Sequence, residues 1–270
     1  MIKKVKRQLK YHIKNMIPSD VRQKLQPRKI QAFCVGIPKT GTTSFAAILE
    51  QNYRAAHEPE YGLIVSKMYQ HYHHQLTDGE YCRFLRKRGK RLWLDFESSC
   101  FMGYRPDLLY RAFPDAKYIL TVREPKSWLD SNFNDNINYP ASMPFNAYWH
   151  EVFFEPHKYS YTPYGTVLKE YNLYPIDAYL TYWVSANSSV VQAIPDYQLL
   201  IIDLKQLNRS IHRLADFLSI APDSLNIQNS HRNKTKTEKK YDIINLIDAN
   251  YLQDRIDALC AEWKSKLFDS

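Results

Sequence analysis

The sequence contains few cysteines and no long apolar run. Its four cysteines are far apart and include no Cys-x-x-Cys pair, so they make neither a zinc-binding pattern nor a disulfide framework. The longest unbroken aliphatic run, Leu199 to Ile202, is too short to span a bilayer. The first residues also lack the apolar segment of a secretory signal. We therefore expect a cytoplasmic protein whose thiols are buried and reduced.

The chain has 270 residues and a formal net charge of +9, all of which its first 29 residues supply. That segment holds ten of the 37 Lys and Arg residues and one of the 28 acidic residues, so residues 30–270 carry 27 of each sign. A nucleic-acid-binding domain would normally spread its basic surface over the fold, so we expect no nucleic-acid partner. The length and the 44% hydrophobic content predict one globular domain over residues 30–270.

Residues 1–29 are predicted to form a basic amphipathic arm. An apolar stripe on a helix, with Lys and Arg around it, is indicated by residues that recur at spacings of three and four: Ile2, Val5, Leu9, Ile13 and Met16. Such a helix could lie on an anionic membrane surface as a peripheral contact, or it could pack against its own domain. The sequence favours neither alternative.

From residue 30, short apolar runs alternate with longer helical stretches, a pattern typical of α/β proteins. We predict a three-layer α/β/α fold with a central, mainly parallel sheet of about five strands, like that of P-loop proteins. Strands are expected near residues 31–36, 53–56, 92–96, 116–122 and 198–203. Helices are expected at 42–51, 62–75, 78–88, 106–113, 126–134, 175–194, 204–218 and 243–267. The aromatic-rich segment 139–174 interrupts the alternation and is predicted to be an acceptor-side insertion or a lid.

A phosphate-loop pattern occupies residues 33–44, Phe-Cys-Val-Gly-Ile-Pro-Lys-Thr-Gly-Thr-Thr-Ser, between a predicted strand and a predicted helix. Backbone amides of such a loop, with the helix N-terminus, form a concave anion site. The spacing Gly36-x4-Gly41 matches the loop of nucleotide hydrolases, which continues with Lys and then Ser or Thr. Here Thr42 replaces that lysine, and Lys39 lies at the loop tip instead. Lys39 is therefore expected to reach a bridging oxygen of a shorter anionic group, and Thr42 and Thr43 to add hydroxyl donors.

A second anion-binding pattern begins at Arg123, which follows the apolar run 118–122. Pro125 fits the first turn of a helix, and Ser131 lies eight residues after Arg123. Both side chains can converge on one phosphate, to which Arg123 would donate charge-assisted hydrogen bonds. Taken alone, Arg123 would be interpreted as an ordinary surface arginine at the end of a strand.

Together, the two patterns resemble the sulfotransferases that use 3′-phosphoadenylyl sulfate (PAPS) as donor. In that family Pro-Lys-x-Gly-Thr-Thr-Ser binds the 5′-phosphosulfate and Arg-x-Pro-x5-Ser binds the 3′-phosphate, and both occur here in that order. Residues 113–117, Phe-Pro-Asp-Ala-Lys, are also similar to the family's lead-in to the arginine strand. The resemblance covers residues 31–134 well and 196–218 loosely. It implies that the 3′-phosphate is bound by Arg123 and Ser131, and the 5′-phosphosulfate by Pro38, Lys39, Thr40, Gly41, Thr42, Thr43 and Ser44.

The resemblance further implies sulfuryl transfer from PAPS to a hydroxyl or amine of a small-molecule, lipid or carbohydrate acceptor. Adenosine 3′,5′-bisphosphate would be the product, and no metal would be required. The glycine-rich C-terminal cofactor loop of many members has no counterpart here, and the nearest candidate is segment 230–236. Arg232 and Lys234 are its predicted cofactor contacts, with a solvated basic turn as the alternative.

Sulfuryl transfer needs a base at the acceptor and positive charge at the leaving phosphate, and Lys39 suits the second role. The base is expected beside the phosphosulfate, near the carboxyl ends of the strands. Two acidic clusters are predicted there: Glu58 and Glu60 after the second strand, and Asp95 and Glu97 after the third. Carbohydrate-directed members of the family often place a Glu shortly after the second strand, so Glu58 and Glu60 rank first.

Two other functions stay open. A P-loop kinase or NTPase would use Asp203, after the run 199–202, as a magnesium ligand, but it would also need a lysine at position 42. A membrane-associated module with a degenerate nucleotide site is the alternative that is not an enzyme. His71, His73 and His74 make no convincing metal site and are expected on a solvated helical face.

Overall fold

Five parallel strands form the sheet of the computed structural model, which describes residues 23–231 and 239–268. The strands are β1 (Ala32–Cys34), β2 (Ala55–His57), β3 (Phe96–Ser98), β4 (Lys117–Val122) and β5 (Leu199–Asp203). Their order across the sheet is β2-β3-β1-β4-β5, and all four neighbouring pairs are parallel. The carboxyl ends of all five strands therefore lie at one edge, where the loops after β1 and β4 meet.

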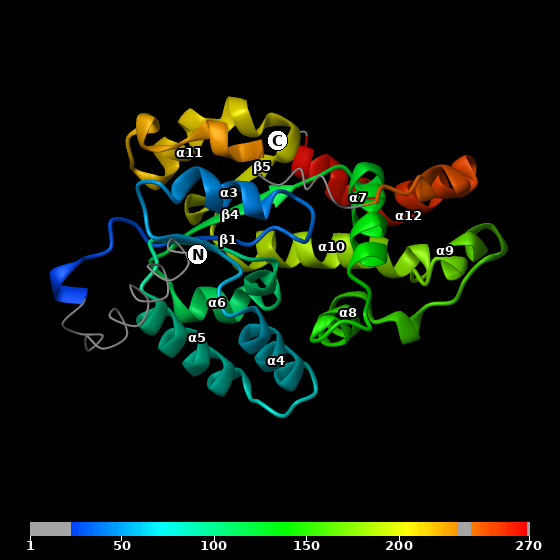
Figure 1. Cartoon of the computed structure of the whole chain (residues 1–270), viewed down its shortest axis with the longest axis horizontal. Helices are drawn as coiled ribbons and strands as arrows, with labels where there is room; N and C mark the ends of the chain where they lie inside the picture. The colour runs from blue at the N-terminus through cyan, green and yellow to red at the C-terminus, as the bar shows by residue number, and fades with distance from the viewer. Residues whose placement is uncertain (1–22, 232–238, 269–270) are drawn as a thin grey trace, which may run out of the picture.

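Helices cover both faces of the sheet and complete the predicted three-layer α/β/α fold (Figure 1). One face carries α3 (Thr42–Leu49) and α11 (Ile211–Leu218). The other carries α4 (Tyr61–Tyr72), α5 (Asp78–Leu92), α6 (Pro106–Ala112) and α10 (Ile176–Ala193). Side chains alternate along β4. Ile119 therefore packs on the face that carries α3 and α11, while Tyr118 and Leu120 pack on the opposite face. Both faces of the sheet are thus buried.

The remaining α-helices lie toward the right of Figure 1, and two of them belong to the aromatic-rich segment 139–174. They are α7 (Pro125–Asn138), α8 (Asn146–Phe154), α9 (Thr166–Glu170) and α12 (Ala249–Phe268). Phe153 of α8 stacks on Tyr182 of α10 with ring centroids 4.8 Å apart, and Phe154 lies 4.7 Å from Tyr179. Part of the aromatic content of residues 139–174 therefore forms a packed core against α10.

The third strand begins later than predicted. Helix α5 continues to Leu92 and ends at Trp93, which has a φ of 51°, so β3 starts at Phe96. Glu97 lies within this buried strand because Arg88 pairs with it at 2.8 Å. A carboxylate is not expected in a buried strand unless its partner is known, so the apolar pattern alone places the strand too early. The predicted bounds of 92–96 are therefore wrong, because the strand occupies Phe96–Ser98.

Two of the predicted helices are interrupted. Residues Leu204–Ser210 form a 3-10 helix that precedes α11, and Ile243–Leu246 form another before α12. Asp203 initiates the first, because its carboxylate accepts a hydrogen bond from the Lys205 N–H at 3.0 Å. The other predicted helices, and the existence of all five strands, are confirmed with shifts at their ends.

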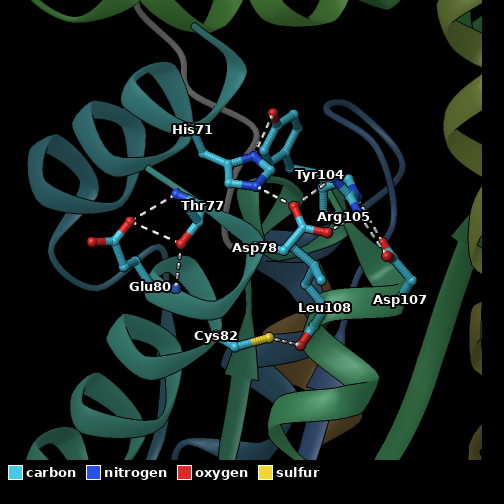
Figure 2. Close-up of polar contacts among 9 residues, drawn as sticks. All are labelled: His71, Thr77, Asp78, Glu80, Cys82, Tyr104, Arg105, Asp107 and Leu108. Carbon is cyan, nitrogen blue, oxygen red and sulfur yellow. Dashed lines mark hydrogen bonds and ion pairs between the residues drawn. The ribbon is translucent and has the colours of Figure 1, made fainter. Parts of the chain in front are cut away.

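A polar network joins α4, α5 and the loop before α6 (Figure 2). Thr77 and Glu80 form a capping box at the start of α5, in which each side chain accepts a hydrogen bond from the other residue's N–H. His71 is buried, and its ring nitrogens lie 2.9 Å from Asp78 Oδ1 and 3.1 Å from Tyr104 Oη. The predicted solvated face is thus wrong for His71. Among the described residues, no group of three or more His, Cys, Asp or Glu side chains could hold a metal ion.

Most of the predicted arm lies outside the described residues, which begin at Gln23. Its last residues contact the domain: Arg28 donates a hydrogen bond to Gly89 O at 2.8 Å and lies over the Trp93 ring at 4.2 Å. The Lys29 N–H donates to Asp95 Oδ1 at 2.9 Å. Within residues 23–231 and 239–268, no helix has the length and apolar character needed to cross a membrane.

Candidate active site

The loop between β1 and α3 is fixed by close packing against β4 and α7. A Cβ at Gly36 would overlap Thr121 Oγ1 of β4, so only glycine allows this approach. Thr40 is fully buried, and its Oγ1 lies 2.8 Å from Thr121 Oγ1. The Trp128 indole N–H of α7 donates to Pro38 O at 2.8 Å. Among the predicted donor-binding residues, Pro38 and Thr40 therefore shape the loop.

The loop tip brings a lysine and a helix N-terminus to the carboxyl edge of the sheet. Lys39 and Gly41 have left-handed backbones, with φ of 66° and 94°. Gly41 is the N-cap of α3, and the first turn, Thr-Thr-Ser-Phe, contains no acidic residue. The start of α3 therefore offers backbone N–H groups and the positive end of the helix dipole to an anion. Lys39 Nζ lies 2.9 Å from Asp135 Oδ1 of α7.

His57, the last residue of β2, contacts both hydroxyl groups at the start of α3. Its Nε2 lies 3.2 Å from Thr42 Oγ1 and 3.1 Å from Thr43 Oγ1. Burial lowers the pKa of His57 to about 4, so its ring is neutral at pH 7. The ring therefore orients the two hydroxyls without adding a charge. His57 is not among the predicted site residues, although its place at the carboxyl end of a strand points to it.

Arg123 directly follows β4, as predicted, and contacts the phosphate loop. Its Nη1 donates to Lys39 O at 3.3 Å, and its Nε donates to Ser127 Oγ at 2.9 Å. The Trp183 indole N–H of α10 holds the backbone of Arg123 through a 3.0 Å hydrogen bond to its carbonyl. Ser127 and Ser131 both lie on α7, which begins two residues after Arg123. The two predicted phosphate-binding patterns are thus adjacent in the fold.

Glu58 follows β2 and lies in a setting that raises its pKa. Its Oε1 accepts a hydrogen bond from Cys100 Sγ at 3.3 Å and lies 3.7 Å from His57 Nε2. Burial raises the pKa of Glu58 to about 7, and the carboxylate of Asp135 adds to the rise. A carboxyl group that titrates near neutrality can accept and release a proton at physiological pH.

Two other predicted bases, Glu60 and Glu97, are held by arginines of α5. Both oxygens of Glu97 accept hydrogen bonds from Arg88 Nη1 at 2.8 Å, and both residues of this pair are buried. Glu60 pairs with Arg91 through both oxygens and with Arg88 Nε at 3.4 Å. The hydrogen bonds from Arg91 lower the pKa of Glu60. These pairs tie β3 and the start of α4 to α5.

Asp95 does not follow the third strand, as predicted, but precedes it. It therefore lies at the amino edge of the sheet, opposite the phosphate loop. Arg54 donates to its two oxygens through Nε at 2.9 Å and Nη2 at 2.7 Å. Burial alone would raise the pKa of Asp95, but the hydrogen bonds from Arg54 keep it below the ordinary value. The error follows from the late start of β3.

A cavity of about 350 Å³ opens between Glu58 and α7. Pro38 of the phosphate loop and Asp135 of α7 form one side of it. Segment 139–174 supplies another wall, and aromatic residues from three parts of the chain contribute: Tyr61, Phe101, Tyr139 and Trp149. Asp135 is a further residue absent from the predicted site. Its position one helical turn after Ser131 is the signal in the sequence that points to it.

The other predicted cofactor contacts are Arg232, Lys234 and Ser44. Arg232 and Lys234 lie outside the described residues. Ser44 lies in the first turn of α3, next to Thr43. Asp203, the magnesium ligand of the kinase hypothesis, accepts the hydrogen bond that starts the 3-10 helix after β5.

A family model described as the sulfotransferase domain matches residues 31–237, well over half of the chain. The chain belongs to the sulfotransferase family. It is therefore an enzyme of the sulfotransferase type, and the matched segment contains the whole parallel sheet, the phosphate loop and Arg123. Sulfotransferases generally use PAPS and act on small-molecule acceptors. The comparison with curated proteins finds no match.

Several solved sulfotransferase structures are also similar to this sulfotransferase, at low identity. The enzyme from Alicyclobacillus acidocaldarius is 17% identical, with 87% of this chain and 99% of that chain covered and a TM-score of 0.43. The sulfotransferase STF9 from Mycobacterium avium is 12% identical, with 92% of this chain and 80% of that chain covered and a TM-score of 0.49. The sulfotransferase domain of the Synechococcus PCC 7002 olefin synthase is 14% identical, with 88% of each chain covered and a TM-score of 0.42. The family assignment rests on the domain match.

Proposed function

We propose that this sulfotransferase transfers a sulfuryl group from PAPS to a hydroxyl or amine of an acceptor bound in the cavity beside Glu58. The observation that carries the proposal is the position of Lys39 and Glu58 relative to one cavity. Lys39 pairs with Asp135, and Asp135 and Glu58 line the same cavity. A carboxylate of raised pKa for the acceptor thus lines the cavity, and a cation for the leaving phosphate is paired with another residue of the same lining.

The residues present suit a donor that is anionic at both ends. The N-terminal amides of α3, together with Lys39 and the hydroxyls of Thr42 and Thr43, suit the 5′-phosphosulfate. Arg123 and Ser131 would hold the 3′-phosphate, Arg123 through charge-assisted hydrogen bonds. Arg123 already lies against the loop tip, at 3.3 Å from Lys39 O. Pro38, Thr40, Gly41 and Ser44 would complete the loop, with Arg232 and Lys234 as further contacts.

The chemistry assigned to the chain is a proton transfer and a charge stabilisation. Glu58 would accept the acceptor's proton while the acceptor oxygen or nitrogen bonds to sulfur. The bond from sulfur to the bridging phosphate oxygen breaks, and its electron pair stays on the phosphate of adenosine 3′,5′-bisphosphate. Lys39 and the loop amides would stabilise that negative charge, so no metal ion is required. Glu58 would then release its proton to solvent.

Segment 139–174 is proposed as the acceptor-side wall of a single domain that covers residues 30–270. Its support is that Tyr139, Asn146 and Trp149 line the cavity while α8 packs on α10. The small-molecule class of acceptor suits the volume of the cavity, which is near the lower end of ligand sites.

For the arm we propose peripheral contact of a cytoplasmic protein with an anionic membrane surface. Its net charge of +9 and its apolar stripe support this. Deletion of residues 1–22 leaves the contacts of Arg28 and Lys29 with the domain in place, and it should abolish binding to vesicles that contain anionic lipid. Binding that survives the deletion would contradict a membrane role for the arm.

Calorimetry with two nucleotides tests the proposed donor. Adenosine 3′,5′-bisphosphate should bind, and ATP with magnesium should bind much more weakly, because Thr42 stands where a nucleotide hydrolase has its lysine. Binding of ATP–magnesium without binding of the bisphosphate would overturn PAPS as donor and favour a kinase. Transfer of labelled sulfate from PAPS to a panel of alcohols, phenols and sugars then tests the activity itself.

A further inference from the structure

The cavity beside Glu58 has an excess of negative charge. Its lining contains two carboxylates, Glu58 and Asp135, and no Lys or Arg occurs among the described residues that line it. Lys39 contacts one of them, Asp135, through an ion pair at 2.9 Å. Two carboxylates in one cavity repel each other, so either one of them keeps a proton or a further positive charge enters, and Glu58 must lose its proton to act as a base.

The donor increases this imbalance. Under the proposed function, Lys39 must also serve the anionic phosphosulfate at the phosphate loop. One ammonium group then serves the donor and Asp135 together. A positively charged group next to Asp135 would restore the balance without taking Lys39 from the donor.

The aromatic wall of the cavity suits such a group. The hydroxyl of Tyr61 donates to Asn146 Oδ1 at 2.7 Å and accepts from the Trp149 indole N–H at 3.1 Å. The ring of Tyr61 also packs edge-on against Phe101, with centroids 5.4 Å apart. Because the polar atoms of Tyr61, Asn146 and Trp149 form hydrogen bonds with one another, the wall offers mainly ring surface to a ligand. Aromatic faces attract cations, most strongly where water is excluded.

We infer that the acceptor carries a cationic nitrogen as well as its reacting hydroxyl, and that Asp135 is the residue that selects it. This inference rests on the proposed function. The hydroxyl lies at Glu58, the ammonium group pairs with Asp135, and the apolar part of the molecule contacts Tyr61, Phe101 and Trp149. An aromatic ring with a short aminoalkyl chain is the size of molecule that a cavity of about 350 Å³ admits.

Three phenols that differ in the charge of their side chain test the inference. Tyramine is cationic, 4-ethylphenol is neutral and 3-(4-hydroxyphenyl)propionate is anionic. Their affinities are measured for the enzyme saturated with adenosine 3′,5′-bisphosphate, and their kcat/KM values are measured with PAPS. Tyramine should be preferred over 4-ethylphenol by roughly 10- to 100-fold in both measurements, and the propionate should be the poorest ligand.

Substitutions at Asp135 assign the preference to its charge. Asp135→Asn should reduce the preference for tyramine over 4-ethylphenol to nearly one, and Asp135→Glu should keep most of it. Glu151→Gln is the matched control, because Glu151 lies on α8 and pairs with His73 away from the cavity lining. It should leave the ratio unchanged. A ratio between two ligands is insensitive to a general loss of activity or stability in the variant.

The outcomes separate the two proposals. If adenosine 3′,5′-bisphosphate does not bind, the proposed function fails, and the inference fails with it. If the bisphosphate binds, three results overturn the inference alone. These are no preference for tyramine, a preference that persists in Asp135→Asn, and the absence of binding by all three phenols.

Discussion

Cys100 Sγ donates a 3.3 Å hydrogen bond to Glu58 Oε1, whereas each of the other three predicted bases pairs with an arginine. The pKa values follow this difference. Burial raises the pKa of Glu58 to about 7, while hydrogen bonds from arginine hold those of Glu60 and Asp95 below their ordinary values. A base that acts near neutral pH needs a pKa raised toward neutrality, as burial gives Glu58, so Glu58 is the residue to test first.

Glu58→Gln should reduce kcat by about 10²- to 10⁴-fold, the usual contribution of a general base. The affinity for adenosine 3′,5′-bisphosphate should change little, because Glu58 faces the acceptor cavity. Glu60→Gln is the variant for comparison: it breaks the pair with Arg91, so it should lower the melting temperature and cost far less activity. A larger loss of kcat in Glu60→Gln than in Glu58→Gln would transfer the role of base to Glu60.

The rate should rise with pH through about 7. Glu58 must be ionised to accept a proton, and its raised pKa keeps it protonated well above the ordinary value of 4.5. At saturating PAPS, kcat/KM for the acceptor should therefore fall tenfold for each pH unit below the midpoint. A fixed acceptor without a titrating group in this range, such as an aliphatic alcohol, keeps the profile specific to the enzyme. A flat profile between pH 5 and 8 would exclude Glu58 as the base.

Stability should show the opposite trend over the same range. The folded protein keeps a proton on Glu58 that the unfolded chain releases above pH 4.5, so this group stabilises the fold at low pH. That contribution is lost as the pH rises through about 7. Urea unfolding at pH 5, 6, 7 and 8 should therefore show a smaller decline in stability for Glu58→Gln than for the wild type. Identical declines would mean that Glu58 is ionised throughout.

Local patterns in the sequence were sufficient to predict the phosphate loop. The spacing of Gly36, Lys39 and Gly41 is visible without a structure, because the pattern lies within one short loop. The contacts that require the glycines are distant: Gly36 faces Thr121 of β4, and Gly41 faces Leu204. The three-layer fold is equally predictable, because strands and helices alternate and each has its own apolar period.

The residues missing from the predicted site are those whose role depends on partners in other elements. Asp135 becomes part of the site through Lys39, which is 96 positions away in the sequence. His57 does so through the hydroxyls of Thr42 and Thr43, because β2 ends beside α3. The start of β3 was misplaced for the same reason, since only the ion pair with Arg88 makes Glu97 compatible with a buried strand.

Arg123→Ala should weaken binding of adenosine 3′,5′-bisphosphate by roughly 10- to 100-fold, the typical effect of losing hydrogen bonds to a charged group. Adenosine 5′-monophosphate, which lacks the 3′-phosphate, provides the matched control. The wild type should bind it more weakly than the bisphosphate, and Arg123→Ala should bind the two with similar affinity. An equal loss of affinity for both nucleotides would place Arg123 at another part of the donor.

Gly36→Ala should destabilise the fold by about 1 to 3 kcal/mol, the usual cost of forcing an extra methyl group into a packed site. The new Cβ would overlap Thr121 Oγ1 of β4 and lie 2.6 Å from Thr40 Oγ1, so the phosphate loop would have to move away from the sheet. Donor affinity should fall together with stability, because the same movement displaces Lys39. Gly79→Ala is the control: the nearest atom to its Cβ is Thr77 Oγ1 at 4.0 Å, and alanine favours the helix there. Urea denaturation of both variants checks the prediction, which is wrong if Gly36→Ala is as stable as Gly79→Ala.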